Sequence, residues 1–370
     1  MIDWRAPELR REIFQRSYSH SLEHRNFPGM VYSMMEPIAQ EFNLHEDGRA
    51  WFAWLNGNTQ NVVTSYQLLE VAPHPTFWKQ AVDFWSDNFK NLEWDTDRRH
   101  QKSAFGKATE QWFLDYGYNP SQGWLDAAEK GWEEVWKHSI GQPYMGRISA
   151  WSMYEYARIL LGPEIPDVGS WFLEEGSSRS HRNSLCLLSG HDDAWSWDGD
   201  KSELPFLLGL FSELDELAED LFAEAQGRNL VRGPDCYCTP PYNQCMHEPV
   251  TDPNVTRLTM ESALCTFKSW HKPNRRYPNV YSDMMYQRIL KAEARMGRKF
   301  DSLWEIRKKT LPKHLRLEDN PTDPGLAPAK QNLFRETGEV LYIHEDWLDM
   351  EPTSFEKKLS NEPLRKDPKW

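Results

Sequence analysis

The strongest structural signal in the sequence is a long amphipathic helix over residues 204–226. Leucine and phenylalanine side chains recur there at intervals of three and four residues, from Leu207 to Phe222, and acidic side chains fill the other face. Similar spacing recurs over much of the chain, whereas strand patterns are scarce. We therefore expect a mainly α-helical, multi-helix globular fold. Further helices are predicted over residues 8–26, 30–43, 62–71, 76–90, 103–116, 123–138, 146–161, 283–298 and 300–310.

Glycine, proline and asparagine separate these helices and divide the chain into three regions. We expect a helical domain over residues 1–165 that contains the candidate active site, and a second helical domain over 166–311. The remaining residues, 312–370, include seven prolines among 59 residues and show little periodicity. They are predicted to form an extended tail that wraps the body or is partly disordered. Within the tail, residues 340–344 are the best strand candidate.

The charges are unevenly distributed along the chain. The formal net charge is −13, from 43 Lys and Arg against 56 Asp and Glu. Residues 191–224 carry eleven acidic residues and one lysine, whereas residues 265–316 carry fourteen basic and four acidic residues. Cations and aromatic side chains are interleaved in the basic stretch, which predicts contacts with phosphates and stacked bases; the simpler alternative is a solvated helix surface. The candidate DNA-binding residues are Lys268, Trp270, Lys272, Arg275 and Arg276.

Three of the five cysteines lie within ten residues of one another. Cys236, Cys238 and Cys245 are followed closely by His247. Thiolates and imidazole are ligands that zinc prefers, so these four residues are candidates for a structural zinc site in a short Cys/His loop. A loop without metal is an equal alternative, and an iron–sulfur cluster that uses Cys265 as a further ligand is a weaker one.

Nothing in the sequence indicates secretion or a membrane span. The N-terminal stretch is charged and lacks the apolar core of a signal peptide, and no apolar run approaches the roughly 20 residues of a membrane helix. An odd number of cysteines also argues against a disulfide framework. We therefore expect a soluble cytoplasmic protein with no membrane partner.

Histidine and glutamate lie close together near the end of the first predicted helix. His20 and Glu23 are three residues apart, and His20 and His24 are four apart, so either pair shares a helix face. A carboxylate beside an imidazole orients the ring and raises its pKa, which suits a general base. His20 and Glu23 are therefore candidate catalytic residues, and Arg25 is a candidate ligand for a carboxylate or a phosphate. The alternative is an exposed helix with ordinary side-chain pairs.

A second segment places amide side chains directly after the apolar residues 50–55, which are expected to be buried. The residues 56–58 (Asn-Gly-Asn) are predicted to interrupt the helix. Buried amides cost free energy unless they have hydrogen-bond partners, and a flat heterocycle such as a pyrimidine would supply them. A helix cap at residue 58 or 59 would explain only part of the cluster. The candidate substrate-binding residues are Asn56, Asn58, Gln60 and Asn61, with Trp51 and Trp54 as stacking surfaces.

A third segment combines carboxylates with cations at a predicted helix start. Cations near a helix N-terminus favour phosphate or pyrophosphate, and two carboxylates beside them could hold Mg²⁺ or act as a base. Ordinary Asp–Arg pairing on a solvated helix is the alternative. The usual nucleotide-binding and hydrolase motifs are absent from the sequence. The candidate residues are Asp95 and Asp97 for catalysis, and Arg98, Arg99 and Lys102 for binding the leaving group.

The three segments read HSLEHRNFPGMVYSMM, WFAWLNGNTQNVVTSYQLLE and DTDRRHQKSAF. Together they resemble the alpha-glutamyl/putrescinyl thymine pyrophosphorylases, the amino acid:DNA transferases of bacteriophage thymine hypermodification. The resemblance is clearest over residues 15–115 and extends more weakly to ESALCTFKSW near residue 265. It implies a distant relation to helical DNA glycosylases, although the helix-hairpin-helix GPD motif of those enzymes is missing here.

The resemblance also implies a reaction and its partners. A separate kinase would first convert 5-hydroxymethyluracil in DNA to a pyrophosphate ester. The transferase would then displace pyrophosphate from the 5-methylene with the amine of an amino acid or polyamine, in the host cytoplasm if the protein is phage-encoded. In this chemistry the cations of the third segment would neutralise the leaving group, the amides would contact the uracil edge, and a histidine or carboxylate would accept the amine proton.

Two other readings of the same residues stay open. A DNA glycosylase-like enzyme would share the base pocket and the basic stretch, but it would need an Asp or Lys placed at the sugar. A non-enzymatic, zinc-stabilised nucleic-acid-binding protein would use the polar clusters only for structure and would bind without turnover.

Overall fold

The computed structural model describes residues 7–24, 31–94, 99–173, 179–190, 204–231, 249–270 and 281–310. Over these residues the mainly α-helical fold is confirmed, and the strands described are one short antiparallel pair. The predicted Cys/His loop, the tail over 312–370 and the strand at 340–344 lie outside the described residues. In chain order the elements are α1 (Pro7–His24), α2 (Val31–Glu41), α3 (Glu46–Thr59), α4 (Val62–Val71), η1 (Pro75–Phe77), α5 (Trp78–Asp87), α6 (Arg99–Lys102), α7 (Phe105–Tyr116), α8 (Pro120–Ala128), α9 (Trp132–Ile140), α10 (Arg147–Leu161), α11 (Arg179–Ser189), α12 (Leu204–Arg228), β1 (Leu230–Val231), β2 (Val250–Thr251), α13 (Arg257–Trp270), α14 (Tyr281–Met296) and α15 (Asp301–Thr310).

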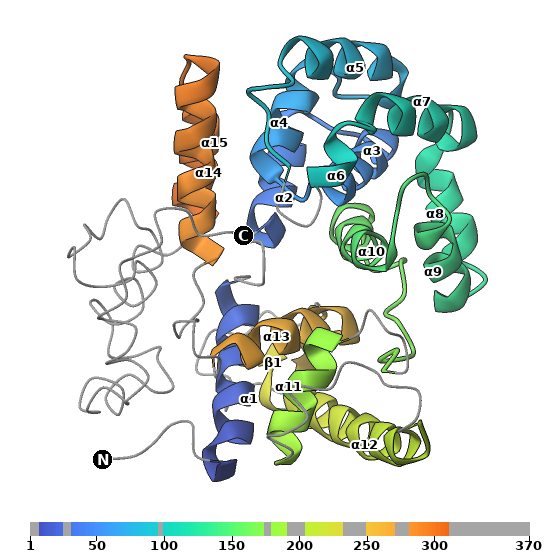
Figure 1. Ribbon diagram of the computed structural model, residues 1–370, viewed down its shortest axis with the longest axis vertical. Coiled ribbons are helices and arrows are strands. Elements are labelled where there is room, and N and C mark those ends of the chain that lie inside the picture. Colours follow the sequence, from blue (N-terminus) through green and yellow to red (C-terminus); the bar gives the residue numbers. More distant parts are fainter. Residues whose placement is uncertain are drawn as a thin grey trace, which may run out of the picture.

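The helices gather in two groups that do not follow chain order (Figure 1). Helices α3 to α10 form one group. Helix α1 packs with α11, α12 and α13 in the other, where Gln15 Nε2 donates a hydrogen bond to the Leu221 carbonyl at 2.8 Å. Conversely, the two last helices of the described chain pack on early ones, α14 on α4 and α15 on α2. Contacts therefore cross residue 165 in both directions, and the domain boundary expected there stays a prediction.

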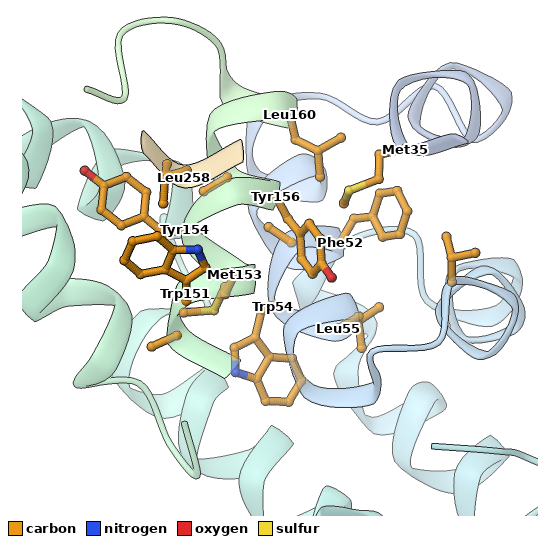
Figure 2. Packing of buried hydrophobic residues seen from close by; sticks show 14 of the residues in the cluster. Met35, Phe52, Trp54, Leu55, Trp151, Met153, Tyr154, Tyr156, Leu160 and Leu258 are labelled. Atoms are coloured by element: carbon orange, nitrogen blue, oxygen red, sulfur yellow. The ribbon is translucent and has the colours of Figure 1, made fainter. Parts of the chain in front are cut away.

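The core of the first group lies where α3 crosses α10. Trp51 and Trp54 of α3 are buried and stack with ring centroids 5.3 Å apart, and the Trp112 ring from α7 lies about as close to each. Figure 2 shows Phe52 and Trp54 beside Met153 and Tyr156 of α10. Large aromatic surfaces that are removed from water contribute strongly to stability, so this crossing anchors the group.

The expected interruption at residues 56–58 is wrong, because α3 continues unbroken to Thr59. The glycine permits a close approach of two helices. A Cβ added at Gly57 would lie 2.9 Å from Met153 Cβ on α10. The helix ends at Thr59, and the next residue, Gln60, caps it in a left-handed conformation with φ of 46°. The cap of the next helix is Asn61, whose side-chain oxygen accepts from the backbone N–H groups of Val63 and Thr64.

Other helix predictions agree with the structure within a few residues, with one division and two omissions. The helix expected over 123–138 is two helices, α8 and α9, separated near Gly131, which has a φ of 107°. Helices α11 and α13 were not predicted. Their buried faces include many polar side chains, so the apolar periodicity that marks a helix is weak in them.

Among the described residues, no helix has both the length and the apolar character needed to cross a membrane.

Candidate functional site

The structure brings the second and third predicted segments together. Trp94 directly precedes the third segment, and its indole Nε1 donates to Asn58 Oδ1 at the end of α3, at 2.9 Å. The Thr64 hydroxyl in α4 donates to the backbone carbonyl of Glu93 at 2.6 Å. The amide cluster therefore adjoins the chain that leads into residues 95–102.

The amides of the second segment take part in a buried polar network. Ser65 Oγ donates to Asn56 Oδ1 at 3.1 Å and lies 2.8 Å from Thr59 Oγ1. Gln60 Nε2 donates to Ser152 Oγ on α10 at 2.9 Å. Part of the cluster is therefore explained by hydrogen bonds within the protein, and Asn61 acts as the helix cap.

Several polar atoms of this network remain without a hydrogen-bond partner among the described residues. Nδ2 of both Asn56 and Asn58 and Nε1 of Trp54 are buried donors, and Oε1 of Gln101 is a buried acceptor. The orientation of the Asn58 amide is fixed, because an indole N–H only donates and must face the amide oxygen. Its Nδ2 therefore faces away from Trp94. Buried groups in this state are costly, which favours a polar ligand or further polar partners at this site.

The tryptophans of the second segment do not form an exposed surface. Trp51 is 0% exposed and Trp54 is 1% exposed. The Trp51 indole also donates to the Ala72 carbonyl at 2.8 Å, which fixes the ring in the core. A role for either ring as a stacking surface would need a face that this conformation does not offer. Both rings project from α3 toward the Trp112 ring of α7, and their predicted role at a substrate stays a prediction.

Among the candidate cations of the third segment, Lys102, the last residue of α6, has a described side chain. Its ammonium donates to the Leu92 carbonyl and lies 4.6 Å from the Phe89 ring centroid. Burial lowers the pKa of Lys102, and the charge of Arg295 on α14 lowers it further. Arg295 is paired with Glu93 at 2.7 Å. A cationic pair, Lys102 and Arg295, thus lies beside the amide cluster, and sequence analysis did not single out Arg295 within the basic stretch.

For many of the other predicted residues, the side chain or the whole residue lies outside the part of the chain that the structure describes. Arg99 lies on α6, and Lys268 and Trp270 lie on α13, but their side chains are outside the described set. The residues outside the described ranges altogether are Arg25, Asp95, Asp97, Arg98, Cys236, Cys238, Cys245, His247, Lys272, Arg275 and Arg276. Their predicted roles stay predictions.

The first predicted segment lies on α1, in the other helix group. His20 is on this helix, with its side chain outside the described set, and Glu23 is exposed. The helix is fixed by Tyr18, whose hydroxyl is 2.8 Å from Thr259 Oγ1 of α13. Burial raises the pKa of Tyr18 well above its ordinary value, so this hydroxyl stays protonated.

A cavity of about 230 Å³ lies between the end of α10 and the start of α13. Its polar lining includes Glu155 and Arg158 from α10, together with Asn254, Thr256 and Thr259. Glu155 is buried and accepts a hydrogen bond from Ser262 Oγ at 2.7 Å. A carboxylate and a guanidinium in one cavity can bind the two charged groups of an amino acid. Sequence reasoning missed this site, although a glutamate on the buried face of a helix was a usable signal.

The fold and these sites define a helical protein with a buried amide cluster, a neighbouring pair of cations and a cavity that offers opposite charges. No known protein-family model matches the chain, and no solved structure matches it. The chain is similar to a curated protein of Salmonella phage ViI that is named Serinyltransferase. The two are 26% identical over 367 residues, which cover 92% of this chain and 84% of the phage protein.

Proposed function

We propose that this protein is an amino acid:DNA transferase of thymine hypermodification. The similarity to a phage serinyltransferase along most of both chains carries this proposal. The substrate would be a 5-hydroxymethyluracil base in DNA that bears a pyrophosphate ester. A C–N bond forms between the amine and the 5-methylene carbon, the C–O bond to pyrophosphate breaks, and the amine proton passes to a base.

The buried amides are the proposed site for the uracil edge. Uracil presents two carbonyl acceptors, and the amide cluster contains buried donors at Asn56 and Asn58 that lack partners among the described residues. The base would have to leave the helical stack to reach them, at a cost of a few kcal/mol. Hydrogen bonds to these groups would offset part of that cost.

The leaving pyrophosphate is assigned to the cations beside the cluster. Lys102 Nζ lies 6.0 Å from the ring centroid of Trp94, which is bonded to Asn58, and Arg295 pairs with Glu93, the residue before Trp94. Positive charge that is placed before the reaction stabilises the negative charge that develops on the leaving oxygen. The predicted cations Arg98 and Arg99 belong to the same stretch of chain.

The amine donor is assigned to the cavity between α10 and α13. Arg158 would bind the α-carboxylate of an amino acid, and Glu155 would bind the α-ammonium group. The amine must be neutral when it attacks, so a base must take its proton, and we propose Glu155 as a candidate in addition to the earlier ones.

The test uses DNA that contains the pyrophosphorylated base, a mixture of amino acids and mass spectrometry of the released nucleosides. Transfer adds the mass of an amino acid less water to the 5-hydroxymethyluracil nucleoside and releases pyrophosphate. We expect Lys102→Ala to reduce the rate by at least about tenfold, because one such contact is worth over 1 kcal/mol in the transition state. Lys107→Ala, an exposed lysine on the next helix, is the matched control and should retain full activity.

A DNA glycosylase-like activity, the alternative reading, would instead produce abasic sites in the same assay. Unchanged or merely hydrolysed base with every amino acid would overturn the transferase proposal. Equal loss in the Lys102→Ala and Lys107→Ala variants would overturn the assignment of the leaving-group site alone.

A further inference from the structure

A histidine, a glutamate and a cysteine meet in the second helix group, away from the amide cluster. His181 lies on α11, and Glu261 and Cys265 lie on α13. Because Glu261 and Cys265 are four residues apart on one helix, their side chains share a face, and that face packs against α11. His181 and Glu261 are buried, and Cys265 is half-buried.

The imidazole of His181 is held in an orientation that suits metal binding. Its Nε2 lies 2.9 Å from the Trp171 carbonyl, which can only accept, so Nε2 carries a proton. Its Nδ1 lies 2.9 Å from Glu261 Oε1, so this nitrogen faces the carboxylate. Histidine ligands of metals typically donate their other ring N–H to a carbonyl or carboxylate in this way.

The three donor atoms are close enough to share one ion. The imidazole nitrogen, a carboxylate oxygen and the thiol sulfur all lie within 4.8 Å of one another. Zinc is bound at about 2.0–2.3 Å by these three kinds of ligand, which places ligand atoms less than about 4 Å apart. A small adjustment of the side chains would therefore complete the site. Nitrogen, oxygen and sulfur together favour zinc over magnesium or calcium.

The surrounding charges are compatible with a divalent ion. Arg147 Nη1 lies 3.7 Å from Glu261 Oε1 and would oppose a cation. However, Zn²⁺ together with one thiolate and one carboxylate ligand would carry no net charge.

We propose that His181, Glu261 and Cys265 bind one zinc ion that links α11 to α13, with a water molecule as the fourth ligand. The site uses none of the residues of the predicted Cys/His loop, and it does not depend on the proposed transferase activity.

Cobalt substitution tests this site in the full-length protein. The thiols of the loop would add their own signal, so the background carries Cys236→Ser, Cys238→Ser and Cys245→Ser. In this background we expect one Co²⁺ per chain, visible ligand-field bands and a near-ultraviolet thiolate-to-cobalt band. Cys265→Ser should abolish the thiolate band, and His181→Gln should weaken metal affinity by at least about tenfold. Cys186→Ser, a buried cysteine on α11 outside the cluster, is the matched control and should retain both.

Absence of bound cobalt and zinc in the background, or a thiolate band that persists in Cys265→Ser, would overturn the proposal. A second measurement keeps the test valid if a variant does not fold. Zinc should slow alkylation of Cys265 in the metal-depleted wild-type chain and leave alkylation of Cys186 unchanged, as peptide mass spectrometry would show. Equal alkylation of Cys265 with and without zinc would also refute the site.

Discussion

Replacing Gly57 by alanine should destabilise the protein, although alanine is the better helix former. In an open helix position the substitution gains about 1 kcal/mol. At Gly57 the new Cβ would lie 2.9 Å from Met153 Cβ, whereas ordinary carbon contacts are about 3.5–4.0 Å. Neither atom can rotate away, so α3 and α10 must separate by about 0.6–1 Å. Overpacking of this kind costs about 1–3 kcal/mol, and we expect a net loss of up to about 2 kcal/mol in the free energy of unfolding.

The chain offers a matched control at Gly209 in α12, where an added Cβ would meet no atom within 4 Å. Gly209→Ala should therefore stabilise the protein by about 0.5–1 kcal/mol. Urea denaturation of both variants at constant pH gives the comparison through the transition midpoints and slopes. If Gly57→Ala stabilises the protein as much as Gly209→Ala does, the account of the α3–α10 contact is wrong.

Three further outcomes are expected. Burial lowers the pKa of His138 to about 4 from 6.5, so protonation of this side chain opposes folding. The free energy of unfolding should therefore fall by roughly 3 kcal/mol as the pH drops from above 6.5 to below 4. A His138→Gln variant that keeps this loss would contradict the assignment. Asp167 accepts from the backbone N–H groups of Arg257 and Leu258 at 2.7 and 3.3 Å, so Asp167→Ala should cost about 1 kcal/mol in urea denaturation, and no loss would show that α13 needs no such cap. Trp94→Phe leaves Asn58 Oδ1 without its donor, which should lower stability by about 1–3 kcal/mol in the same assay; a neutral effect would mean that water replaces the indole.

The helices with apolar stripes could be predicted from the sequence, and α4, expected over 62–71, has the same bounds in the structure. Helix α11 could not be predicted, because its buried residues include His181, Arg182 and Asn183. Their partners are distant in sequence, and local periodicity carries no information about such contacts. Gly57 led to the opposite error. Glycine is typical of helix breaks, but here it lies within α3 and allows α10 to approach closely.

The candidate site was predictable in composition but not in geometry. The amide cluster and the segment that begins after Trp94 were recognised as polar groups in need of partners, and the Trp94–Asn58 bond places them together. The burial of Trp51 and Trp54 could not be read from adjacency to polar residues, because it depends on the helices that pack over them. Arg295 and the cavity at Glu155 depend on contacts between segments about ninety or more residues apart.

The position of α1 has a consequence for how the chain folds during synthesis. The hydrogen bond between Tyr18 and Thr259 joins residues 241 positions apart. At about 5–20 residues per second, α1 leaves the ribosome roughly 10–50 seconds before its partner helix exists. During that interval Phe14 and Leu22, which are buried in the folded protein, lack the later helices that bury them. The yield of folded protein should therefore be more sensitive to translation rate and chaperone supply than that of a chain whose first helix packs on its nearest neighbours.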